Sequence, residues 1–378
     1  MDGPYERHHF PILNHLTQLS SCSQSALHTE VRAAIDEFIE SWSIRGMDWD
    51  AWMAACEEAR RTFANLIGAE PDEVALVSSV SHGLSAVATS LPRRGRHKIV
   101  TTLLDFPCVG NVWLSQPDLQ VTFLSPDNGE IPLDRYAESI DEQTLLVSTF
   151  HVAYYNGYKQ DVARIARIAH DHGAYVLVDA YQSAGQIPLD VKKMDIDILI
   201  TGLQKYLLGT PGLAFLYVRR ELAEQIQPRV TGWFGQANPF AFNPAVIHYA
   251  PGARRFDNGT APMINAFAAK AALSIIQRVG VERIHTYLHA LVRDGLDYLG
   301  RHGLTVRGPL DPTARGSNLA VVVPDAHVME DRMRKEGFIV SARQDVVRIA
   351  PHFYNSAADV RNAVDCLIHL LQKGEAVP

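Results

Sequence analysis

Apolar residues follow two different spacings along the first 218 positions of the chain. Residues 26–42 and 51–67 carry them at helical spacing, and 160–173 repeats this pattern before ending at Gly173. Between such segments lie short, almost continuous apolar runs, which predict strands buried on both faces. Strands that alternate with helices in this way predict a mostly parallel sheet covered by helices. The predicted strands are 73–79, 98–105, 119–126, 144–152, 174–180, 197–202 and one that ends at Val218.

The pattern changes after Arg219. Residues 232–262 are rich in Gly, Pro, Asn and aromatic residues and show little periodicity, which is typical of a functional loop. A helical region follows from Ile264 to about Arg301, and the remaining residues alternate between strand and helix patterns. We therefore predict two domains: a large one over 16–262, and a small α+β domain formed by 263–378 together with 1–15.

Composition narrows the class of protein. Apolar residues make up 47% of the 378 positions, charged residues 20%, and the net charge is −7, so no basic surface for nucleic acid is expected. Four scattered cysteines form no C-x-x-C pair, which argues against a zinc site or a disulfide framework. No metal site is expected. Without a signal-peptide pattern or an apolar run of about 20 residues, we expect a cytoplasmic protein with no membrane partner.

Several candidate functional residues lie at or just after the ends of predicted strands. One apolar strand ends in Asp179, and Lys205 comes just past the next strand; Ser81 and Phe106 also follow strand ends. Ligands of open α/β sheets bind at this edge. A lysine and a carboxylate in this arrangement suggest a site for pyridoxal phosphate (PLP). The lysine would hold the cofactor's aldehyde as a Schiff base, and the carboxylate would keep its pyridine nitrogen protonated.

The sequences LVDAYQSAG (177–185) and TGLQKYLLGTPG (201–212) resemble the core signature of the class V aminotransferase family. These are PLP enzymes of fold type I, among them kynureninases, cysteine desulfurases, isopenicillin-N-epimerase-like enzymes and several transaminases. The resemblance extends from about residue 12 to about residue 370. It implies an α/β large domain with a small C-terminal α+β domain, PLP as cofactor, an amino-acid substrate, and a homodimer with active sites at the subunit interface.

The same resemblance implies roles for individual residues. Phe106, in DFPC, would stack on the cofactor ring, and Gln182 would contact the ring hydroxyl. Phosphate contacts would come from the helix start at Ser81 and His82, where Ser81 could also cap the helix, from Gln204, and from Thr260 of the partner subunit. This chain departs from the common pattern at two positions, with Ser81 in place of Thr and Gln204 in place of His or Tyr.

Two further residues would face the substrate. Arg348, in VRIAPHFYN, matches the arginine that binds the α-carboxylate in this family, a task suited to the guanidinium fork. Tyr154 lies near the position of an asparagine that faces substrate in kynureninases. It is expected to act as an acid or base, as a hydrogen-bond donor, or simply as an aromatic wall.

The reaction itself stays open among transamination, racemisation, β-elimination and cleavage at the Cβ–Cγ bond. The segment 337–348 contains no cysteine, which argues against a persulfide-forming desulfurase. Departures from kynureninase motifs argue against kynureninase proper. We favour conversion of an L-α-amino acid through an external aldimine and Cα deprotonation, with β-cleavage or epimerisation, over a true aminotransferase. A catalytically inactive PLP fold that only binds or regulates is disfavoured by the presence of Lys205, Asp179 and Arg348 together.

Overall fold

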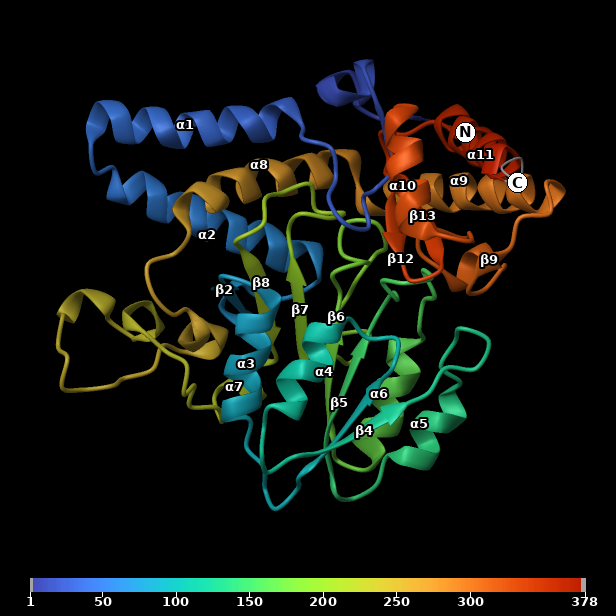
Figure 1. Ribbon diagram of the computed structural model, residues 1–378. Helices are drawn as coiled ribbons and strands as arrows, with labels where there is room; N and C mark the ends of the chain where they lie inside the picture. The colour runs from blue at the N-terminus through green and yellow to red at the C-terminus, as the bar shows by residue number, and fades with distance from the viewer. Residues whose placement is uncertain (1–2, 375–378) are drawn as a thin grey trace.

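The computed structural model describes residues 3–374 and is built around a seven-stranded sheet. Its strands are β2 (Val74–Val77), β3 (Lys98–Thr102), β4 (Gln120–Leu124), β5 (Thr144–Phe150), β6 (Tyr175–Asp179), β7 (Ile198–Gly202) and β8 (Ala214–Val218). They lie in the order β2-β8-β7-β6-β5-β3-β4 (Figure 1). Strands β7 to β4 pair in parallel, whereas β8 runs against both of its neighbours. The mostly parallel sheet predicted from the apolar runs is confirmed.

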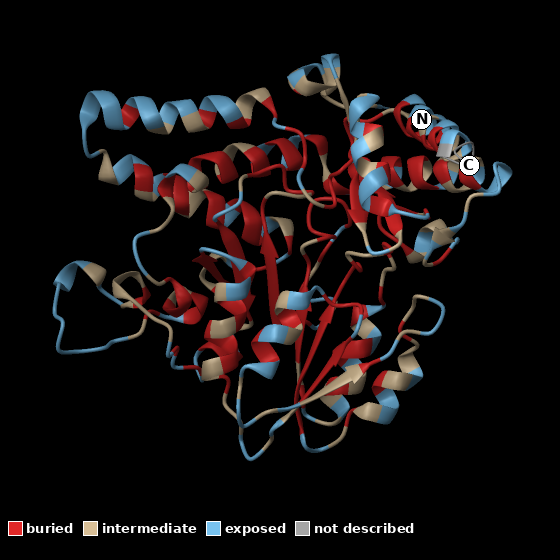
Figure 2. Cartoon of the chain, in the orientation of Figure 1, coloured by how far each residue is buried: buried red, intermediate tan, exposed pale blue. Residues whose placement is uncertain are grey.

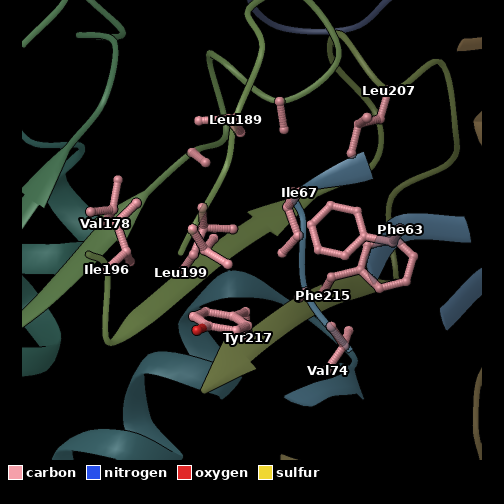
Figure 3. Packing of buried hydrophobic residues seen from close by; sticks show 14 of the residues in the cluster. Phe63, Ile67, Val74, Val178, Leu189, Ile196, Leu199, Leu207, Phe215 and Tyr217 are labelled. Atoms are coloured by element: carbon pink, nitrogen blue, oxygen red, sulfur yellow. The ribbon is translucent and has the colours of Figure 1, made fainter. Parts of the chain in front are cut away.

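Six of the seven strands are almost entirely buried on both faces, whereas the edge strand β4 is mostly half-buried (Figure 2). Successive residues of a strand point to opposite sides of the sheet, so Leu199 and Phe215 enter one apolar cluster while Ile198 and Leu216 enter the other. In the first cluster the rings of Phe63 and Phe215 stack almost in parallel, with centroids 4.2 Å apart (Figure 3). Continuous apolar runs in the sequence therefore reflect two cores that share one sheet.

Helices cover each face. The first cluster is closed by α2 (Trp49–Leu66), α5 (Leu133–Ser139), α6 (Val162–Asp171) and α8 (Met263–Val279). The second is closed by α3 (Val80–Ser90), α4 (Pro107–Leu114) and α7 (Arg220–Ala223). Helix α1 (Thr29–Arg45) lies on α8, where Phe38 meets Phe267 edge to face. These layers hold the strand ends, and hence the candidate site, in fixed positions.

A second, antiparallel sheet forms near the C-terminus with the order β12-β13-β10-β9. Its strands are β9 (Val306–Arg307), β10 (Leu319–Val322), β12 (Ser341–Arg343) and β13 (Val346–Ile349). It shares an apolar cluster with α9 (Val281–Arg301), α10 (Ala326–Lys335) and α11 (Ala357–Gly374). The expected α+β arrangement of this part is present, and the domain boundary at residue 262 remains a prediction.

The helical region predicted from Ile264 to Arg301 is two helices, α8 and α9, because Gly280 interrupts it. Gly280 has a φ of +89°, which side chains other than glycine rarely adopt, and its N–H caps the carbonyl of Ile276. The apolar run 338–342, one of the strand patterns of the C-terminal part, is likewise divided, into β11 (Phe338–Ile339) and β12.

The N-terminal segment links the small sheet to the large one. Its 3-10 turns η1 (Arg7–His9) and η2 (Pro11–Asn14) lead into β1 (Thr17–Gln18), which pairs in parallel with β11 as a separate two-stranded sheet. Ser20 then forms an isolated parallel bridge with Ala350, directly after β13 of the small sheet. From there the chain runs to the carboxyl ends of the large sheet before α1 begins. No helix among residues 3–374 combines the length and the apolar character needed to cross a membrane.

Residues 231–248 form an irregular arm, as their composition predicted, and it extends away from the body at the left of Figure 1. A hollow of about 760 Å³ lies along the arm itself. Phe240, Phe242 and Ile247 are more than half exposed there. The arm thus presents apolar surface that nothing else in the described chain covers.

Candidate active site

A cavity of about 250 Å³ lies at the carboxyl ends of the parallel strands. Strand β6 ends in Asp179, Lys205 follows β7, and Phe106 follows β3. The residues predicted from the sequence that line this cavity are Ser81, Phe106, Tyr154, Asp179, Gln182, Gln204 and Lys205. Side chains from five separate segments of the sequence therefore meet at one edge of the sheet.

The N-terminus of α3 forms one wall of the cavity. The helix is capped by Ser79, whose Oγ accepts a hydrogen bond from the His82 N–H at 3.1 Å, so the expected cap at Ser81 was wrong. Ser81 instead lies in the first turn. The first N–H groups of a helix have no partner inside it, and those of Val80 and Ser81 lie beside the cavity. This wall suits an anion such as phosphate.

Lys205 and Asp179 share the cavity and affect each other's titration. Burial lowers the pKa of Lys205 to about 8, the Arg348 charge lowers it too, and the Asp179 carboxylate opposes both. Burial raises the pKa of Asp179. Two smaller effects lower it: the Tyr181 N–H donates to its Oδ1 at 2.8 Å, and the charge of Lys205 stabilises the carboxylate. Roughly a tenth of Lys205 is consequently a neutral, nucleophilic amine at pH 7, far more than for an unperturbed lysine.

Two aromatic rings lie near the lysine, and a third packs on one of them. Its Nζ lies 4.1 Å from the ring centroid of Tyr181 and 5.7 Å from that of Phe106, and Phe106 meets Tyr154 edge to face at 5.1 Å. Burial raises the pKa of Tyr181 to about 12, so its hydroxyl stays protonated. The sequence analysis missed Tyr181. The alternation of side chains along β6, continued past Asp179, places it on the same side and could have indicated it.

The two predicted glutamines are held by neighbouring groups. Gln182 Nε2 donates to the carbonyl of Cys22 at 2.9 Å, and the Tyr181 hydroxyl donates to Gln204 Oε1 at 3.1 Å. Gln204 therefore retains its Nε2 hydrogens for a ligand in the cavity. The carbonyl of Gln204 accepts from both the N–H and the Oγ of Ser25, at 3.0 and 3.2 Å. The segment 22–25 thus lies directly behind two of the lining residues.

Arg348 lies just behind the cavity wall and does not line the cavity itself. Its side chain is fully buried; Nη1 donates to the Tyr154 carbonyl at 2.8 Å and Nη2 to Ser23 Oγ at 3.0 Å. No carboxylate within residues 3–374 forms an ion pair with it. By contrast, the buried Arg60 is paired with Asp257 at 2.7 Å. A buried cation with no anionic partner is costly unless a ligand supplies the anion.

Besides Arg348, two predicted residues lie outside the cavity. His82 forms hydrogen bonds with Ser78 Oγ at 2.8 Å and with Asn258 at 3.3 Å, and burial lowers its pKa. Thr260 is exposed on the protein surface. The chain does not bring Thr260 to its own cavity, and a role at the site of a partner subunit stays a prediction.

The residues present fit pyridoxal 5'-phosphate. A lysine with a lowered pKa can carry its aldehyde, a buried carboxylate can hold its ring nitrogen, aromatic rings can cover its ring, and a helix N-terminus can receive its phosphate. Each of these groups faces the same cavity.

Comparison with known proteins decides the family. The family model described as aminotransferase class-V matches residues 21–362. The chain belongs to the class V aminotransferase family. The uncharacterized aminotransferase YcbU of Bacillus subtilis is 42% identical over 358 residues, with 94% of this chain and 95% of YcbU covered. The kynureninase of Pseudomonas fluorescens is 27% identical, covering 89% and 82% of the two chains.

Solved structures share the fold of this chain. The apo cysteine desulfurase of Thermococcus onnurineus NA1 superposes with a TM-score of 0.88 at 24% identity, covering 97% of each chain. A C-DES mutant with glycine covalently linked to the PLP cofactor gives a TM-score of 0.88 at 18% identity over 96% of this chain and 99% of that one. The protein is a PLP-dependent class V enzyme of fold type I, as the sequence predicted.

The lowered pKa of Lys205 can be tested by labelling lysines with acetic anhydride and quantifying each by mass spectrometry. Only the neutral amine reacts, so labelling of Lys205 in the cofactor-free protein should rise with pH around a midpoint near 8. The exposed Lys193, whose pKa is raised by Asp190, serves as the control and should respond at a higher pH. In Asp179→Asn the Lys205 midpoint should fall further, because a carboxylate that stabilises the ammonium is lost. Equal midpoints for Lys205 and Lys193 would contradict this account.

Proposed function

We propose that this enzyme removes the Cα proton of an L-α-amino acid and then cleaves a side-chain bond beyond Cβ or reprotonates Cα with inversion. The observation that carries the proposal is Arg348, a buried guanidinium that lacks a carboxylate partner in the described chain and whose charge acts on Lys205. An α-carboxylate would supply the missing anion. The resulting substrate class is an amino acid and not a simple amine.

Burial alone does not single out Arg348. Arg315 is also buried, but three backbone carbonyls, of Pro309, Asn156 and Asn318, accept from its guanidinium. Arg348 differs because it borders Tyr154, whose side chain lines the cavity, and because its charge affects the pKa of Lys205. A substrate held by its carboxylate against Arg348 would therefore have its amino group and Cα near Lys205.

Each residue of the cavity has a task in this proposal. Bound PLP supplies an aldehyde that condenses with amines and a ring that withdraws electrons from the substrate's Cα. Lys205, neutral for part of its population, takes the Cα proton. Asp179 would hold a proton at the ring nitrogen, and Phe106 would stack on the ring. Gln182 would contact the ring hydroxyl, and the α3 N-terminus with Ser81 and Gln204 would bind the phosphate.

Reprotonation or departure of a side-chain fragment needs a second proton donor. Tyr154 and Tyr181 both line the cavity, and the Tyr181 ring lies against Lys205. The Tyr181 hydroxyl, which burial keeps protonated, already donates to Gln204 Oε1, so we assign the second donor to the Tyr154 hydroxyl. Epimerisation would use this donor at the opposite face of Cα, and β-cleavage would use it at the departing side-chain fragment.

The relatives support two reactions. Kynureninases at 26–28% identity favour a side-chain cleavage. The name of YcbU, an uncharacterized aminotransferase at 42% identity, favours transfer of the amino group to a 2-oxo acid, which is our second candidate. A persulfide-forming desulfurase remains disfavoured, because the four cysteines are Cys22, Cys56, Cys108 and Cys366, and none lies in the segment that leads to Arg348.

Incubation with one amino acid at a time distinguishes a lyase or epimerase from an aminotransferase. The PLP-loaded enzyme is mixed with each of the twenty L-amino acids in the absence of any 2-oxo acid, and absorbance, ammonia and chirality are followed. We expect many turnovers with the aldehyde form of the cofactor retained, and a cleaved product or the D-isomer released. A reaction that stops after one equivalent with pyridoxamine phosphate formed, and resumes on adding a 2-oxo acid, would establish the aminotransferase instead. Lys205→Ala is the inactive control.

We further propose a homodimer in which Thr260 reaches the phosphate of the partner subunit's cofactor. Thr260 is exposed and follows the arm 231–248, whose Phe240, Phe242 and Ile247 are exposed apolar side chains. Apolar patches of this kind mark interaction surfaces. The free thiols fit the expected cytoplasmic location, which stays a prediction.

Sedimentation equilibrium should give twice the chain mass. Thr260→Ala should remain dimeric while its PLP dissociation constant rises several-fold, the effect of about 1 kcal/mol expected from one lost hydrogen bond. Thr286→Ala, an exposed threonine on α9, is the matched control and should bind PLP normally. A monomer with full PLP affinity, or a dimer in which Thr260→Ala changes nothing, would refute the shared site.

A further inference from the structure

The segment 20–25 crosses the gap between the cavity and the small sheet. At one end Ser25 holds the carbonyl of Gln204, and Cys22 accepts from Gln182, so the segment is fixed to the cavity wall. At the other end Ser20 shares a short hydrogen bond with Ser341 of β12. Ser23 lies between these two anchors, directly at the guanidinium of Arg348.

The hydrogen bonds of Ser23 leave one group unused. Its Oγ accepts from Ser341 Oγ at 2.9 Å and from Arg348 Nη2 at 3.0 Å. A hydroxyl has two acceptor lone pairs and one hydrogen to donate. Both lone pairs of Ser23 are occupied, and its hydrogen donates to no group within residues 3–374. Because the side chain is only partly buried, this hydrogen is available to a ligand.

Two buried serines, Ser20 and Ser341, determine which lone pairs of Ser23 are occupied. Ser20 and Ser341 are buried, and Ser341 uses its hydrogen toward Ser23, so the chain of hydroxyls points from Ser20 through Ser341 to Ser23. Arg348 also uses Nη1 on the Tyr154 carbonyl and Nε on the Ser341 carbonyl at 3.4 Å, which leaves two of its five N–H groups. The free donors of Arg348 and Ser23 are thus neighbours.

We propose that Ser23 is a substrate-binding residue whose hydroxyl donates to the α-carboxylate that Arg348 also binds. This inference rests on the proposed function, since it takes the substrate to be an amino acid. Donation from an oriented hydroxyl complements the guanidinium, which at this site spends three N–H groups on the protein. The segment before α1 would therefore select for a carboxylate in addition to holding Gln182 and Gln204 from behind the cavity wall.

Equilibrium binding by the PLP-loaded protein tests this without measuring turnover. The probes are two pairs that differ only by the carboxylate, L-alanine with ethylamine and L-phenylalanine with phenethylamine, titrated by absorbance and by calorimetry. Ser23→Ala should weaken binding of the amino acids about tenfold, or ~1.4 kcal/mol, and leave the amines unchanged. Ser23→Thr, which keeps the hydroxyl, should restore the affinity.

Ser21→Ala is the matched control. It removes a hydroxyl from the same segment, one that contacts the Tyr354 hydroxyl at 3.1 Å. It should leave the ratio of amino-acid affinity to amine affinity unchanged in each pair. If Ser23→Ala weakens amino acids and amines alike, Ser23 is structural and the proposal is overturned.

The same binding measurements distinguish a wrong substrate class from a wrong role for Ser23. If neither amino acid perturbs the spectrum or gives heat with the unmodified protein, while the amines do, the amino-acid substrate class is wrong and the role of Ser23 falls with it. If the amino acids bind and the Ser23 variants match the unmodified protein, only the Ser23 inference is wrong.

Discussion

The electrostatic interaction between Asp179 and Lys205 across a buried cavity is the constraint on which the rest of the site depends. Burial favours the neutral form of each group, and the charge of each favours ionisation of the other. The balance leaves a lysine that is both protonatable and nucleophilic near neutral pH. Maintaining that balance requires the strands β6 and β7 to hold their ends in register, which the two apolar clusters on either face of the sheet accomplish.

Arg348 is a third charged group that affects the pKa of Lys205, and it comes from the small sheet. Its guanidinium is presented by β13 and held by the carbonyl of Tyr154 from the large sheet and by Ser23 from the N-terminal segment. Three parts of the sequence that are far apart therefore converge on one cation. Because that cation lowers the pKa of Lys205, binding of an anion to it would also affect the lysine.

Much of this arrangement could be predicted from the sequence, and what could not has physical reasons. Continuous apolar runs indicated the parallel sheet, and strand ends indicated Asp179, Lys205 and Phe106. The break at Gly280 was missed because the apolar spacing continues through it. Tyr181 was missed because a tyrosine beside a strand end also suits a core position, and the contacts of Ser23 depend on pairing over more than 300 residues, which no local pattern contains.

The central claim is that Lys205 removes the Cα proton of an amino acid whose carboxylate lies at Arg348. The most direct test is deuterium incorporation at Cα, followed by proton NMR, when the PLP-loaded enzyme is incubated in heavy water with L-alanine and, separately, L-phenylalanine. The account predicts exchange by the unmodified enzyme and a rate lower by about 10²- to 10⁴-fold in Lys205→Ala. Exchange at the same rate in Lys205→Ala would contradict it.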